Sequence, residues 1–277
     1  MSVLVILIFA AILHASWNAF VKDQNNGLVT VTIISSTMAL LVLPLTFVVG
    51  LPSSEIWIYL LISVVAHTLY LHAMTRAYSL YDFSIAYPFA RGLAPLITVL
   101  ILIIFFNAEV DMFEFIGILL IVSAILLLLP KKISEIGFKN ILSMLYFPLA
   151  ITFYTIVDAE GIQHANNPYQ YIVWIFIFSS IPLLVYNLTF NKDNLINTLN
   201  KNRVRFSITA IISITSYTLV LWAYTQAPTH YVASVRESSI IFASLIGLYF
   251  FKENGVKKRL LAAFILFMGI AILQMYS

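Results

Sequence analysis

The sequence contains no cysteine and few charged residues. None of its 277 residues is a cysteine, which excludes disulfides and thiolate metal sites. Only 10% of the residues are charged, against about 25% in an ordinary soluble domain, whereas 61% are hydrophobic. A soluble fold cannot bury so much apolar surface. The composition therefore predicts an all-α protein that spans a membrane several times.

Signatures of several enzyme classes are also missing. The sequence has no G-x-S-x-G motif, no H-E-x-x-H motif and no ATP-binding P-loop. Its net charge of +3 comes from lysines and arginines between apolar runs, so we expect no nucleic-acid partner. We predict a secondary carrier without a cofactor or metal. An intramembrane enzyme and a non-transporting membrane subunit are the alternatives.

Apolar runs of about 20 residues mark ten predicted spanning helices. They cover residues 2–21, 28–50, 55–78, 84–106, 112–129, 141–160, 168–190, 203–227, 231–251 and 257–275. The connections hold turn-forming or charged residues, and none is long enough for a soluble domain. No lysine or arginine precedes the first run, so we interpret it as a spanning helix rather than a secretory signal.

The two halves of the chain resemble each other. Arg91 recurs as Arg236 at an offset of 145, and Glu109 recurs as Glu253 at an offset of 144. We therefore predict two related five-helix domains and a short connection between them. They cover residues 1–130, 131–140 (the connection) and 141–277. Because five is odd, the second half enters the membrane opposite to the first, which predicts an inverted-topology repeat.

Lysine and arginine are distributed unevenly over the connections. Thirteen of the 15 lie in, or within a few residues of, connections that lead from an odd-numbered span to an even-numbered one, and the other two are Arg91 and Arg236. The opposite face carries none. The positive-inside rule therefore predicts that both termini lie outside the cytoplasm.

Three motifs resemble EamA-type members of the drug/metabolite transporter superfamily. They are His14-Ala-Ser-Trp-Asn-Ala-Phe-Val-Lys22, Tyr87-Pro-Phe-Ala-Arg-Gly-Leu-Ala-Pro95 and Tyr154-Thr-Ile-Val-Asp158. The resemblance implies an α-helical carrier with a central cavity and alternating access. It implies a small-molecule cargo such as an amino acid, an amine or a nucleotide sugar. We expect a monomer or homodimer in the lipid bilayer of a bacterial-type inner (plasma) membrane.

Two features depart from this family. Several of its members keep their termini in the cytoplasm, which contradicts the orientation that the loop charges predict. The small four-helix multidrug members carry a carboxylate in the first span, whereas this chain has none before Asp23. Their proton-exchange mechanism therefore cannot be transferred to this chain.

The two intramembrane arginines are the first candidates for the binding site. A charge inside a span is normally kept only where it faces protein or a water-filled cavity. In an inverted repeat, Arg91 and Arg236 approach the midplane from opposite sides. They contact a substrate or a gate, form a structural ion pair with Glu237, or extend to the interface. If the two arginines contact the substrate, the substrate that fits best is an amino-acid-like zwitterion or another anion. A cationic amine is the alternative substrate.

Other polar residues in the spans are candidates as well. His14 and Asn18 share one helical face with Trp17 beside them, and His14 is either a substrate or proton ligand or a packing residue. Asp158 is either a solvated helix cap or a cavity acid. Glu237 is a proton-linked carboxylate or an arginine partner. Glu237, His14 and Asp158 are therefore the candidates for proton coupling or gating.

Several tyrosines and prolines complete the predicted site. The tyrosines that flank the arginine segments or share a face with Asp158 are Tyr78, Tyr87, Tyr224, Tyr231 and Tyr154. Tyrosine can close a cavity on a ligand by hydrogen bonding or over a cation. Pro88 and Pro95 flank Arg91, which predicts that the fourth span is discontinuous. His67 and His72 are five residues apart and do not share a face well, so we interpret them as core or interface residues.

Overall fold

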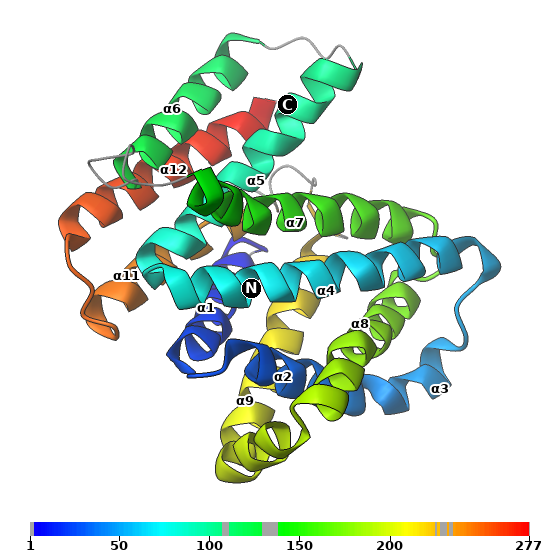
Figure 1. Cartoon of the computed structure of the whole chain (residues 1–277). Helices are drawn as coiled ribbons and strands as arrows, with labels where there is room; N and C mark the ends of the chain where they lie inside the picture. The colour runs from blue at the N-terminus through cyan, green and yellow to red at the C-terminus, as the bar shows by residue number, and fades with distance from the viewer. Residues whose placement is uncertain are drawn as a thin grey trace. The chain divides into compact units, whose positions relative to one another are not determined.

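The computed structural model describes residues 3–106, 111–128, 138–224, 226–227, 232 and 235–276. These residues form helices joined by short connections, and none of them lies in a strand (Figure 1). The ten helices of 11 or more residues are α1 (Val3–Asp23), α2 (Gly27–Val42), α4 (Trp57–Leu80), α5 (Phe83–Phe106), α6 (Met112–Leu128), α7 (Phe138–Gln163), α8 (Pro168–Phe190), α9 (Lys192–Tyr224), α11 (Ser239–Tyr249) and α12 (Val256–Tyr276). Short helical turns at Leu43–Leu45, Thr46–Val49 (α3) and Ser54–Ile56 extend α2 and precede α4.

Four of the described segments are long and apolar enough to cross a membrane by length and composition. They are Val3–Asp23, Gly27–Val49, Ser54–Leu80 and Pro168–Phe190. Two shorter apolar helices are Met112–Leu128 and Ser239–Tyr249. The all-helical fold class is thus confirmed for the described residues, and the arrangement as ten spans stays a prediction.

Two helices differ from their predicted bounds. The connection expected at 191–202 is largely helical, because α9 begins at Lys192 and only kinks at Asn202, whose φ of −141° and ψ of 32° are not helical. The span expected at 231–251 is interrupted by a turn at 237–238, and α11 begins after it, at Ser239. A hydropathy window averages the polar run at 236–239 with the apolar residues on both sides, so it predicts one continuous span.

The fourth predicted span is continuous, contrary to the expectation from its prolines. Helix α5 runs through Pro88 and Pro95 without a break. Each proline removes a single helical hydrogen bond, and neighbouring helices can hold a helix across such a gap. Helix α12 packs closely on α5 between the two prolines, because a Cβ added to Gly92 would lie 2.5 Å from the Leu266 side chain.

The described residues separate into two compact units, each built from both halves of the sequence. The first unit contains Met1–Ala19, Leu80–Thr152 and Thr215–Ser277. In it, α6 packs on α12 and α5 packs on α11. The α6–α12 crossing is close, because a Cβ added to Gly117 would lie 2.9 Å from the Gly269 carbonyl oxygen. Small residues allow such contacts between membrane helices.

The second unit contains Phe20–Ser79 and Phe153–Ile214. Here α2 packs on α8, and the buried Asn187 amide donates to the Thr32 hydroxyl over 2.9 Å. An apolar cluster joins the start of α4 to α8 through the buried side chains of Ile56, Leu60, Tyr171 and Ile175. The helices that pair in each unit occupy equivalent positions in the two predicted halves of the chain.

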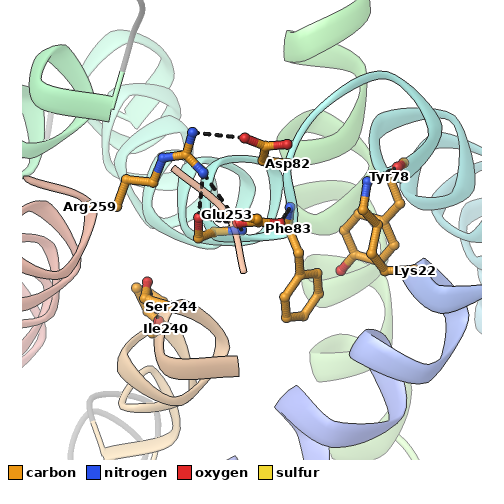
Figure 2. Close-up of polar contacts among 9 residues, drawn as sticks. Lys22, Tyr78, Asp82, Phe83, Ile240, Ser244, Glu253 and Arg259 are labelled. Atoms are coloured by element: carbon orange, nitrogen blue, oxygen red, sulfur yellow. Dashed lines mark hydrogen bonds and ion pairs between the residues drawn. The ribbon is translucent and has the colours of Figure 1, made fainter. Parts of the chain in front are cut away.

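In the first unit, a polar cluster fixes the start of α5. The Glu253 carboxylate accepts hydrogen bonds from the backbone N–H groups of Phe83 (2.7 Å) and Ser84 (3.0 Å) and from the Ser84 hydroxyl. Arg259 donates to the Asp82 carboxylate at 2.7 Å and to Glu253 at 3.2 Å (Figure 2). The first N–H groups of a helix have no partner within the helix. Glu253 supplies that partner, and Arg259 holds the carboxylate in place.

We expect Glu253→Gln to destabilise the protein by about 1–3 kcal/mol, because the amide group would turn a donor toward the N–H donors of α5. The measurement is the free energy of unfolding of the full chain in detergent micelles, followed by circular dichroism. Glu160→Gln is the matched control, since Glu160 is an exposed glutamate on α7. Equal free energies for the two variants would show that Glu253 does not stabilise the start of α5.

Candidate functional site

Both intramembrane arginines of the first unit contact one carboxylate. Arg91 Nη2 lies 3.1 Å from Glu237 Oε1, and Arg236 Nη2 lies 3.3 Å from the same oxygen. The side chains of Arg91 and Glu237 are 4% and 3% exposed, and that of Arg236 is 17% exposed. Two charged residues from the two halves of the chain therefore meet at a third, and all three are largely buried.

The turn before α11 makes this arrangement possible. Neighbouring side chains on a continuous helix do not face each other. At Glu237 and Ser238 the backbone forms a turn, in which Ser238 N–H donates to the Val235 carbonyl over 3.0 Å. The side chains of Arg236 and Glu237 can therefore lie in contact although they are adjacent in sequence. Ile240 N–H then donates to the Glu237 carbonyl over 3.0 Å, where α11 begins.

Helices α1 and α5 add further polar groups to the first unit. The Tyr87 hydroxyl lies 2.7 Å from His14 Nδ1, and the Tyr87 side chain is fully buried. Tyr87 is one helical turn before Arg91 on α5. Asn18 donates to the His14 carbonyl over 2.9 Å, and the Trp17 ring meets the imidazole edge-on at 5.5 Å between centroids. The predicted face of α1 thus contains groups that reach α5.

The second unit holds a separate buried acid. Asp158 Oδ1 accepts hydrogen bonds from the Ser63 hydroxyl and from the Tyr171 hydroxyl, the latter at 3.0 Å. Asp158 Oδ2 lies 2.8 Å from His67 Nε2. The interpretation of Asp158 as a solvated cap is therefore wrong. Helix α7 continues to Gln163, which places Asp158 more than one turn inside the helix and leaves it 4% exposed.

The predicted tyrosines are divided between the units. Tyr154 contacts the rings of His67 and Tyr70, with centroid separations of 4.9 and 4.8 Å. Tyr78 is buried in the last turn of α4, where its carbonyl accepts a 2.6 Å hydrogen bond from Lys22 Nζ (Figure 2). Both tyrosines belong to the second unit.

Two of the predicted tyrosines cannot be placed in either cluster. Tyr224 is the last residue of α9, and its side chain lies outside the described part of the structure. Tyr231 lies wholly outside the described residues, as does Glu109, the predicted counterpart of Glu253.

Sequence reasoning missed the partners of Asp158. The spacing of five residues between His67 and His72 does not identify a shared site. The informative spacing is the four residues between Ser63 and His67, which places both side chains on one face of α4. Within the described residues, no group of three or more histidine, aspartate or glutamate side chains is arranged to hold a metal ion. The contacts in both clusters are hydrogen bonds and ion pairs.

A comparison with known families agrees with this architecture. Residues 138–275, which include Asp158, Arg236 and Glu237, match the EamA-like transporter family. A search for relatives among curated proteins found no match. The matched region corresponds to the second predicted half of the chain. The chain belongs to the EamA-like transporter family of the drug/metabolite transporter superfamily, and it is a multi-pass membrane protein of a family of small-molecule carriers.

Proposed function

We propose that this protein is a secondary carrier of a small anionic or zwitterionic metabolite, with an amino-acid-like compound as the best fit. The observation that carries the proposal is the convergence of Arg91 and Arg236 on Glu237 Oε1. A charged side chain within a bilayer is costly, by insertion scales about 2.5–3.5 kcal/mol for each residue. Because of this cost, two arginines at one buried position indicate a functional site rather than a packing role.

Guanidinium groups suit an anionic ligand. Each presents several N–H donors in a planar fork that matches the geometry of a carboxylate or phosphate. Glu237 contacts Arg91 and Arg236 through a single oxygen, so a ligand carboxylate can bind beside it on the same two guanidinium groups. Tyr87 extends this polar surface along α5, and its hydroxyl can rearrange between His14 and a ligand.

The second oxygen of Glu237 favours a ligand that also carries a donor. Glu237 Oε2 is buried and has no hydrogen-bond partner among the described residues. A buried carboxylate oxygen without a donor is unfavourable, and an ammonium group of a substrate would supply one. A compound with both a carboxylate and an ammonium group therefore satisfies the arginines and Glu237 together.

The proposed transport mechanism is alternating access by ten spanning helices in two inverted five-helix repeats. The pairing of α5 with α11, α6 with α12 and α2 with α8 supports it, because each pair joins equivalent helices of the predicted halves. The turn before α11 also supports it, since carriers place interrupted helices at their substrate sites. We place the protein in a bacterial-type inner membrane, with the lysine- and arginine-rich connections in the cytoplasm.

We expect Arg91→Ala and Arg236→Ala to lose binding of amino acids while inserting and folding normally. The measurement is a thermal-shift screen of the purified full chain against the proteinogenic amino acids, since a ligand of the folded state raises its apparent stability. Binding at 100 times the dissociation constant adds about 2.7 kcal/mol. Lysine at either position should restore binding only in part, because it lacks the planar fork.

Arg76→Ala is the matched control for the arginine variants. Arg76 is an exposed arginine near the end of α4, and its removal should leave the ligand-induced shift unchanged. Tight binding of a purely cationic amine that survives both Arg91→Ala and Arg236→Ala would contradict the proposal. That result would favour the amine carrier and leave the two arginines as structural partners of Glu237.

The orientation is tested separately. A reporter enzyme that is active only in the cytoplasm, fused after Ser277, should remain inactive, because the loop charges place this end outside. The same reporter inserted after Lys132, in a connection expected to be cytoplasmic, should be active and serves as the positive control. Activity after Ser277 would show that the orientation predicted from loop charges is wrong.

A further inference from the structure

The acid of the second unit is buried and has hydrogen-bond partners on both oxygens. Asp158 Oδ1 accepts hydrogen bonds from the hydroxyl groups of Ser63 and Tyr171. Asp158 Oδ2 lies 2.8 Å from His67 Nε2. In the arrangement that we infer, Asp158 is ionised and accepts from all three partners, so the hydrogen between Oδ2 and the imidazole belongs to Nε2.

This assignment makes Nδ1 of His67 the atom that gains or loses a proton. With Nε2 bonded to Asp158, a neutral His67 gives the pair a net charge of −1. A proton from water that binds Nδ1 gives an imidazolium beside a carboxylate, with a net charge of zero. The His67 side chain is 19% exposed, whereas that of Asp158 is 6% exposed. The histidine is thus the more accessible member of the pair.

A line of polar side chains leads along α4 to this pair. Tyr59, Ser63 and His67 are spaced four residues apart and therefore share one face of the helix. The first contacts His164, an exposed residue just after α7, at 3.3 Å between the hydroxyl and Nε2. The next two contact Asp158. Since Tyr59 and His67 are eight residues apart, the line extends about 12 Å along the helix.

Three helices meet at the pair. Ser63 and His67 come from α4, Asp158 from α7 and Tyr171 from α8. The other titratable groups packed around it are Tyr154, whose ring lies 4.9 Å from that of His67, and Tyr70, at 6.3 Å. A change in charge at the pair therefore alters the contacts between three helices at once, and in a low-dielectric interior such a change is strongly felt.

We propose that His67 and Asp158 form a proton-binding site that couples proton movement to the transport cycle. The proton enters from water along the Tyr59–Ser63–His67 face of α4, binds Nδ1 of His67, and leaves from the same atom to water after the helices have rearranged. Glu237 is less suited to this role, because it lies between two arginines as their counter-ion. The proposal rests on the carrier function, but it concerns residues of the other unit.

The test measures conformation without a substrate. The chain has no cysteine, so spin labels react only with the cysteines that are introduced. Leu51→Cys and Met112→Cys are suitable positions, because both side chains are exposed (78% and 71%). Leu51 lies in a connection that we expect on the outer face, and Met112 is the first residue of α6, at the end of another such connection. Double electron–electron resonance of the full chain in lipid nanodiscs then reports the populations of the distances between the labels.

In the labelled parent chain, the ratio of two distance populations should change by about tenfold between pH 5 and pH 8. One coupled proton changes such a ratio by at most about tenfold per pH unit. Asp158→Asn and His67→Gln should each make the ratio independent of pH, and the double variant should behave like either single one. Asp158→Glu retains the acid and should retain the pH dependence.

His72→Gln is the matched control, because it removes a histidine from the same helix outside the Ser63–His67 face. It should leave the pH dependence intact. A parent ratio that does not depend on pH would overturn the proposal, and so would a pH dependence that persists in both Asp158→Asn and His67→Gln. If the parent chain binds no amino acid in the thermal-shift screen, the proposed cargo is wrong. That result would leave the spin-label result unaffected.

Discussion

A charged group in a membrane interior must be accompanied by a partner, and the described structure follows this constraint. Glu237 lies between two arginines, and Asp158 lies against a histidine and two hydroxyl groups. Nearer the helix ends, Arg259 bridges two carboxylates. Apolar packing distinguishes poorly between helix neighbours in lipid, because lipid tails are as apolar as leucine. The polar clusters therefore contribute much of the specificity with which these helices find their partners.

Most of the helices could be predicted from the sequence, because each is a long apolar run between polar connections. The break before α11 was not predicted, since the polar run at 236–239 is short and a hydropathy window averages it with the apolar residues around it. The prolines of α5 predicted a break in that helix, whereas the break lies before α11. Their effect depends on how neighbouring helices pack on α5, and the residue that packs against Gly92 between them, Leu266, comes from a distant part of the sequence.

The arginines of the candidate site could be found from the sequence, because the similarity of the halves relates Arg91 to Arg236. Their shared contact with Glu237 could be named only as one alternative. It depends on a turn that brings two adjacent side chains together. The environment of Asp158 depends on where α7 ends. The sequence predicts the end at residue 160, whereas the helix continues to Gln163, and this shift of three residues decides between a solvated and a buried acid. Helix ends are the least certain part of any sequence-based assignment.

The first unit has a consequence for how the protein is made. Its apolar core joins α1 to the end of α9, and the Ser216 hydroxyl donates to the Ala10 carbonyl across 206 residues of sequence. At about 5–20 residues per second, roughly 10–40 s separate the synthesis of these two residues. During that interval α1 lies in the bilayer without its final neighbours, and its buried face is covered by lipid or by an insertion factor. Biogenesis of this carrier is therefore completed by its last helices, and a chain that stops early leaves its first helix without a core.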